Sequence, residues 1–173
     1  MKYQNDGGPS PGQISDLFRR VMSPSVADQT LARFVDALAW NWLIAGTDAH
    51  AKNYSLLLAG GQVRLAPLYD IASALPYEHE RGLRFAMKIG SDYRVFFYGN
   101  PWGKAADELG LDREIVIDRV RKLANVVSDT VAEAAAQPDI VALMRTLPGR
   151  LVDLVADRAK RCAQLVESSR GAD

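Results

Sequence analysis

The chain has 173 residues and balanced charge, with 21 Lys plus Arg against 21 Asp plus Glu. Its hydrophobic fraction of 48% and charged fraction of 24% are typical of a folded globular protein, which excludes a disordered or collagen-like chain. Zero net charge argues against broad electrostatic attraction to nucleic acid or to anionic membranes. We therefore expect one packed unit, with no direct nucleic-acid binding and no membrane contact.

The cysteine content and the N-terminal sequence indicate the compartment. Cys162 is the only cysteine, which excludes an internal disulfide and a cysteine-based zinc site and fits a reducing environment. The N-terminal segment has no apolar stretch of signal-peptide length, and no run of about 18 apolar residues occurs. These features predict a cytoplasmic protein.

The first part of the chain has helical signals. Ser10 precedes a proline, which predicts a short helix that reaches about Met22. A longer helix follows, with Ser25 or Asp28 as its N-cap and Gly46 as the residue that ends it. The apolar periodicity of this helix predicts that its aromatic side chains belong to a core and do not stack on bases: Phe34, Trp40 and Trp42.

The middle of the chain changes to extended structure. Residues 54–58 and 63–67 read as two strands of a hairpin that turns at Gly60 and Gly61, and Asp70 follows the return strand. Residues 83–89 form a second extended segment. Beyond it the pattern is helical, over 101–109, 112–137, 138–147 and 148–166.

The last helix carries a run of alternating charges. Arg158, Lys160 and Arg161 are interleaved with Asp153 and Asp157 at helical spacing. Pairs three or four residues apart are neighbours on a helix surface. This pattern predicts a solvated, ion-paired face.

The densest group of chemically capable residues is TDAHAKN, residues 47–53, on the loop between the long helix and the hairpin. In the catalytic loop of protein kinases, an Asp accepts the substrate hydroxyl proton and an Asn five positions later binds magnesium. Asp48 and Asn53 have this separation, and Asp70 can supply a second ligand from the far side of the hairpin. Together the three residues predict a phosphoryl-transfer site.

Four segments of the chain resemble successive motifs of the HipA-like kinases, the toxin kinases of HipBA-type toxin–antitoxin pairs. They are KYQNDGGPS, NWLIAGTDAHAKNYSLLL, VRLAPLYDIAS and LRFAMKIG. The resemblance implies a mainly α (α+β) fold: a protein-kinase-like C-terminal lobe over residues 1–173, with a helical bundle and a small β-hairpin that carries the metal site. It also implies phosphorylation of a protein serine or threonine with ATP and Mg²⁺ as cofactors.

The resemblance assigns roles to residues at matching positions. Asp48 matches the catalytic base, while Asn53 and Asp70 match the magnesium ligands that hold the nucleotide. His50 and Lys52 match the D-x-H-x-K-N motif and are expected to position the phosphate or the loop in catalysis. One departure is Gly46-Thr47, where the family commonly has Gly-Asn.

A second departure concerns the nucleotide clamp. Neither a Gly-rich phosphate-covering loop nor a strand lysine of the V-A-I-K kind precedes Asp48. We therefore expect a catalytic lobe without the N-terminal nucleotide-clamping lobe, inactive or weakly active by itself. The expected partners are ATP, a protein substrate, and a HipB-like antitoxin or a separate N-lobe chain.

Two other interpretations stay open. The chain could be a non-catalytic helical module that binds an antitoxin or a partner kinase lobe and retains kinase motifs by descent. Asp48, His50 and Asp70 could instead form a metal-hydrolase cluster, for which His79 is the one further histidine.

Overall fold

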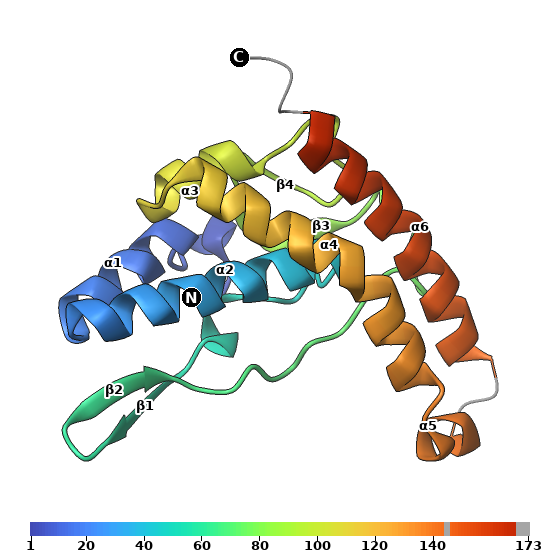
Figure 1. Ribbon diagram of the computed structural model, residues 1–173, viewed down its shortest axis with the longest axis horizontal. Coiled ribbons are helices and arrows are strands. Elements are labelled where there is room, and N and C mark those ends of the chain that lie inside the picture. Colours follow the sequence, from blue (N-terminus) through green and yellow to red (C-terminus); the bar gives the residue numbers. More distant parts are fainter. Residues whose placement is uncertain (144–145, 169–173) are drawn as a thin grey trace.

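The computed structural model describes residues 1–143 and 146–168, and the fold is mostly helical (Figure 1). The helices are α1 (Pro11–Val21), α2 (Pro24–Ile44), α3 (Trp102–Leu109), α4 (Arg113–Ala135), α5 (Pro138–Leu143) and α6 (Leu147–Glu167). The strands are β1 (Leu56–Ala59), β2 (Gln62–Leu65), β3 (Arg84–Ile89) and β4 (Asp92–Arg94), and 3₁₀ turns cover Gln4–Asp6 and Ala51–Asn53. In the described ranges, no helix is long and apolar enough to cross a membrane.

The strands form two antiparallel hairpins, one more than the sequence predicted. In the first, Leu56 pairs with Leu65 and Ala59 with Gln62, around a turn in which Gly60 and Gly61 both have positive φ. This hairpin projects away from the helices (Figure 1). In the second, the extended segment predicted over 83–89 is confirmed as β3, which pairs with the short strand β4.

The first two helices begin at prolines. The predicted start of α1 is confirmed by a capping box, in which Ser10 and Gln13 each bond the other's backbone N–H with the side chain. The predicted N-cap of α2 was wrong: the helix begins at Pro24, after Ser23. Proline fits the first turn because the N–H that it lacks would have no partner within the helix.

The end of α2 differs in detail from the prediction at Gly46. Ala45, with φ 54°, is the left-handed residue at this end. Gly46 is required for space: a Cβ there would lie 2.2 Å from Asn41 Oδ1. The absence of a side chain therefore allows the chain to leave the helix close to Asn41.

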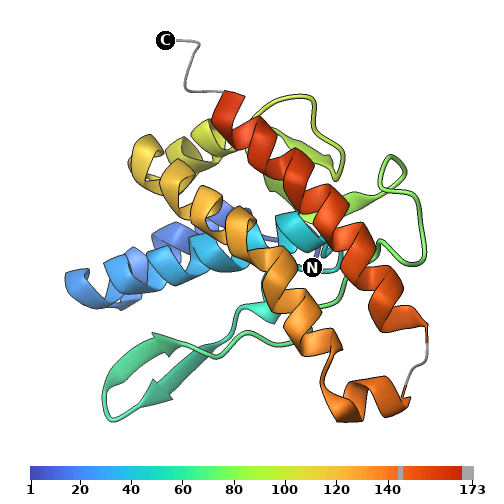
Figure 2. The same ribbon diagram turned by 45° about the vertical axis from the view of Figure 1, so that its right-hand side comes forward.

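The core lies where α2 packs beneath α4 and α6, which run side by side in opposite directions (Figure 2). Phe34 and Trp42 are fully buried, as predicted, while Trp40 is half-buried against the core. The rings of Trp42 and Trp102 meet edge to face, with their centroids 5.7 Å apart. This contact joins α2 to α3.

The charged run on α6 departs at Arg158 from the solvated face that its spacing predicted, whereas Asp153, Asp157, Lys160 and Arg161 are exposed as expected. Arg158 is 3% exposed, and it donates hydrogen bonds to Trp42 O, Val95 O and Glu80 Oε2. Arg161 bonds the other oxygen of Glu80. The spacing rule considers neighbours on one helix, whereas the partners of Arg158 come from three other segments. Arg158 thereby anchors α6 to the carboxyl-terminal end of α2.

Candidate functional site

The loop that follows α2 is tied to three distant segments through its backbone. The N–H groups of Ala74, Ala86 and Ala51 donate to Ala45 O at 3.1 Å, to Thr47 O at 3.0 Å and to Lys2 O at 3.4 Å, respectively. These bonds connect the loop with the segment after the hairpin, with β3 and with the N-terminus. A loop held in this way can present side chains in a fixed arrangement.

Asn53 joins two of the predicted site residues. Its Nδ2 donates to the backbone oxygen of Asp48 at 3.4 Å and to Asp70 Oδ2 at 3.3 Å. The same nitrogen lies 3.5 Å from Asp70 O. Asn53 is buried, and Asp48 and Asp70 are exposed. The structure therefore brings Asp48, Asn53 and Asp70 to one place, with both carboxylates open to a ligand.

Asp70 has an unusual backbone. The strand β2 ends at Leu65, so Asp70 lies five residues beyond it and not at its end as predicted. Its φ of 56° is in the left-handed region, which costs an L-residue about 1 kcal/mol or more. Among L-residues, Asn and Asp tolerate this region best. The conformation directs the Asp70 carboxylate to the Asn53 amide.

The Asp48 carboxylate is surrounded by three side chains. Tyr3 donates its hydroxyl proton to Asp48 Oδ1 at 2.8 Å, and Lys2 Nζ lies 3.8 Å from the same oxygen. His50 Nε2 lies 4.0 Å from it. The side chain of Asp48 is 59% exposed, which leaves it accessible from solvent.

His50 and Lys52 differ sharply in their surroundings. His50 is buried, its ring meets that of Tyr3 edge to face at 5.5 Å, and its Nδ1 has no hydrogen-bond partner among the described residues. Lys52 is exposed, and its backbone oxygen accepts a hydrogen bond from the Tyr69 hydroxyl. His50 therefore lies at the site, whereas only the main chain of Lys52 has a defined contact there.

Lys2 and Tyr3 were missed as site residues by the sequence analysis. They belong to the KYQNDGGPS motif, which served only to establish the resemblance. The interaction of Lys2 with Tyr3, together with the Asp48 and Asp70 carboxylates, raises the pKa of the Lys2 ammonium above its ordinary 10.5. Lys2 is therefore a cation at neutral pH, beside the Asp48 carboxylate.

The donor set fits a hard divalent cation. Carboxylate and amide oxygens are the ligands that Mg²⁺ takes, usually with several waters and substrate phosphates. Asn53 and Asp70 carry both types of oxygen on neighbouring side chains, with the Asn53 Nδ2 donating to Asp70 Oδ2. Across the described residues, no group of three or more His, Cys, Asp and Glu side chains could hold a metal, and His79 Nδ1 instead accepts a bond from the Arg81 N–H. The cleft beside Asn53 and Asp70 is small, about 10 Å³.

Comparisons with known proteins identify relatives of this chain. The protein Y4mE of Sinorhizobium fredii, named as a candidate kinase, is 29% identical over 160 residues, which cover 92% of this chain and 37% of Y4mE. The serine/threonine-protein kinase toxin HipA of Shewanella oneidensis is 28% identical over 130 residues, which cover 73% of this chain and 28% of HipA. The chain thus spans well under half the length of these relatives.

A solved structure shares the fold. HipA of Shewanella oneidensis, in its complex with HipB and operator DNA, superposes with a TM-score of 0.77 at 22% identity, over 96% of this chain and 38% of HipA. The sequence pattern of the HipA-like C-terminal domain matches residues 1–135, which include every candidate site residue. The chain belongs to the family of HipA-like C-terminal domains.

Proposed function

We propose that this chain is the catalytic lobe of an ATP-dependent serine/threonine protein kinase of the HipA type. The observation that carries the proposal is the Asn53 amide, which bonds both the backbone of Asp48 and the carboxylate of Asp70. A base and two oxygen ligands are thereby grouped as phosphoryl transfer requires. The kinase names of the relatives support the same activity.

In this proposal Asp48 acts as the base. Its exposed carboxylate accepts the proton of a substrate Ser or Thr hydroxyl, whose oxygen forms a bond to the γ-phosphorus of ATP. The bond from the γ-phosphorus to the bridging oxygen breaks, and ADP leaves with that electron pair. Tyr3 holds Asp48 Oδ1 through its hydroxyl, so that Oδ2 is free to receive the proton. His50 supports the Tyr3 ring from the side of the loop.

Asn53 and Asp70 would hold Mg²⁺, which neutralises charge on the β- and γ-phosphates when it is bound. Their mutual hydrogen bond orients both side chains before the nucleotide arrives. Such preorganisation lowers the cost of binding. Lys52, exposed on the same loop, would contact phosphate or orient the loop.

The small cleft at Asn53 and Asp70 cannot enclose a nucleotide, so a second surface has to cover it. We infer that an N-terminal lobe supplies this surface and that the chain alone binds Mg-ATP only at millimolar concentration. We further propose a HipB-like antitoxin as a partner, because the similar HipA structure contains HipB. The cytoplasm is the compartment in which such a kinase would act.

The test measures phosphate transfer from γ-labelled ATP to protein, with the chain alone and with an N-terminal kinase lobe added in trans. Transfer that requires both the added lobe and Asp48 would support the catalytic role. Asp48-independent transfer would contradict the assignment of the base. If no transfer occurs and Mg-ATP does not bind, a non-catalytic module that binds an antitoxin or a kinase lobe becomes the better interpretation.

A further inference from the structure

The N-terminal motif KYQNDGGPS folds into a turn that faces the candidate site. Gln4–Asp6 form a 3₁₀ turn, which Gly7 ends with φ 91°. The Gly8 N–H donates to Tyr3 O at 2.8 Å, and a Cβ on Gly8 would lie 2.7 Å from that oxygen. One glycine is therefore needed for its backbone angle and the other for its close approach. Together they fix the direction of the chain at Tyr3.

Two further contacts hold this turn against the rest of the site. The Lys88 N–H of β3 donates to Gln4 Oε1 at 2.7 Å. The Ala51 N–H, within the candidate catalytic loop, donates to Lys2 O at 3.4 Å. The turn is thus bonded to β3 through the Gln4 side chain and to the loop that carries Asp48 through the Lys2 backbone. Lys2 is held at the site by its backbone as well as by its charge.

The side chain of Lys2 reaches toward the Asp48 carboxylate. Its Nζ lies 3.8 Å from Asp48 Oδ1 and 4.6 Å from the centre of the Tyr3 ring, and the Asp70 carboxylate acts on it electrostatically. It is 39% exposed, so its ammonium can leave Asp48 for an incoming anion without a large desolvation cost. A phosphoryl group that sits between the base and the metal ligands would meet this ammonium.

We propose that Lys2 binds the γ-phosphoryl group of ATP, an assignment that rests on the proposed kinase function. Its position meets a requirement of the site: the doubly charged γ-phosphate has to approach the Asp48 carboxylate, and Lys2, beside that carboxylate, supplies positive charge there in addition to Mg²⁺. Lys2 contributes a compact charge with three donors. Lys52 is the lysine of the D-x-H-x-K-N motif, but among the described residues its side chain has no defined contact with the carboxylate of Asp48 or of Asp70.

The experiment compares nucleotides that differ only in the γ-phosphate. Backbone amide signals of Asn53 and Asp70 are followed by NMR while the chain is titrated with Mg-ADP and with Mg-bound imido-ATP, which is not hydrolysed. Lys2→Gln is expected to weaken binding of imido-ATP about tenfold, the scale of one charge-assisted hydrogen bond, and binding of ADP less than about twofold. Lys2→Arg should restore most of the loss.

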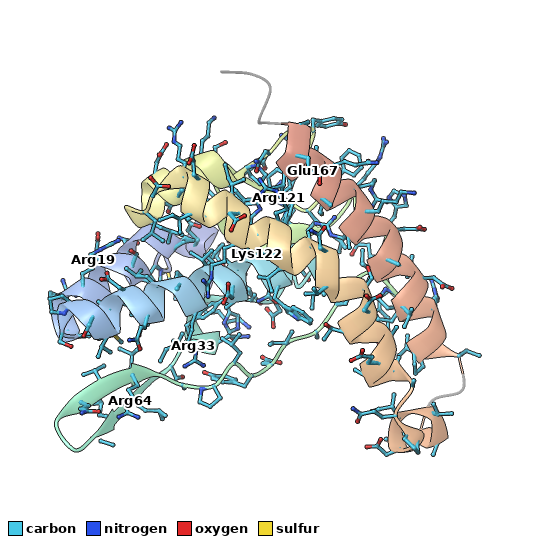
Figure 3. All side chains as sticks on the ribbon, in the orientation of Figure 1. Arg19, Arg33, Arg64, Arg121, Lys122 and Glu167 are labelled. Atoms are coloured by element: carbon cyan, nitrogen blue, oxygen red, sulfur yellow. The ribbon has the colours of Figure 1, made fainter. Side chains whose placement is uncertain are left out.

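Two matched variants serve as controls. Lys122 lies on the outer surface of α4, where it pairs with Asp118, and Lys122→Gln should change neither affinity (Figure 3). Lys52→Gln tests the competing assignment. Three outcomes would overturn the assignment of Lys2. Lys2→Gln could lower the affinity for ADP and imido-ATP equally, or leave both affinities unchanged. Alternatively, only Lys52→Gln could lower the affinity for imido-ATP selectively. If the unaltered chain binds neither nucleotide, the proposed function fails and the role of Lys2 fails with it.

Discussion

The Asn53 amide bonds the Asp70 carboxylate across a gap of 17 residues in sequence. This hydrogen bond connects the loop that follows α2 with the segment that follows the first hairpin. It links a neutral donor to an anionic acceptor, and such bonds are stronger than those between neutral groups. The two residues proposed as metal ligands are therefore held as a pair before any cation binds.

Two substitutions of Asp70 should distinguish the effect of its charge from the effect of its backbone conformation. Asp70→Asn retains a residue type that tolerates the left-handed conformation, so stability should change by less than about 0.5 kcal/mol while Mg²⁺-dependent nucleotide binding falls. Asp70→Ala should in addition lose about 1 kcal/mol, because alanine at φ 56° is strained. Urea denaturation and Mn²⁺ titration measure the two effects. Asp129→Asn, on the exposed side of α4, is the control.

Replacement of the proposed base should affect the reaction and leave the fold unchanged. Asp48→Asn has nearly the same shape and still offers Tyr3 an oxygen acceptor. Because the side chain is 59% exposed, the midpoint of urea unfolding should stay unchanged. The rate of phosphate transfer with an N-terminal lobe present should fall by about 100-fold or more. A wild-type rate in this variant would show that Asp48 is not the base.

Loss of Arg158 should destabilise the whole protein. Arg158→Met leaves the buried Glu80 carboxylate paired with Arg161 and removes the donors to Trp42 O and Val95 O, so we expect a loss of about 3 kcal/mol. Lys160→Met, two residues away on the exposed side of α6, should cost less than about 0.5 kcal/mol. Urea unfolding followed by circular dichroism compares the two. Equal stabilities would show that the buried ion pair is not structural.

Cys162 should be inert in the folded protein. Burial raises the pKa of its thiol to about 11, from an ordinary value of 9.0, while Arg158 acts in the opposite direction. The folded state therefore keeps the proton longer than the unfolded state. The thiol's contribution to stability is complete below about pH 9 and is lost as pH rises through 11. Reaction with a thiol reagent at pH 8 should be slow until urea unfolds the chain; rapid reaction of folded protein would contradict this.

The sequence predicted most of the elements because their signals are local. The Ser10 cap with its following proline, the Gly60–Gly61 turn and the apolar spacing of α2 each lie within a few residues of the structure that they specify. The grouping of Asp48, Asn53 and Asp70 was predicted because a known spacing served as a template. Their metal-binding and catalytic roles stay predictions.

The errors concern contacts between distant residues. Tyr3 bonds Asp48 across 45 positions, and Arg158 bonds Glu80 across 78. Nothing in the residues next to Arg158 indicates this partner, whereas Asp153 and Asp157 suggest a local one. A helical charge pattern reports which residues share a face, and only the packing of other segments determines whether that face meets solvent.

The contacts of Arg158 show that the end of the family pattern and the end of the packed fold are different positions in the chain. The family pattern ends at residue 135, but α6 begins at Leu147 and supplies the Arg158 guanidinium, which donates to the Trp42 carbonyl near the end of α2. The helix that leads directly into the Asp48 loop is thus bonded by a segment that lies outside the residues matched by the family pattern, although the similarity to Y4mE covers 92% of the chain. The packed unit of the fold therefore includes α6, beyond the end of the family pattern at residue 135. A chain shortened to residues 1–135 would keep every proposed site residue and lose the helix α6, which bonds the end of α2 just before the Asp48 loop.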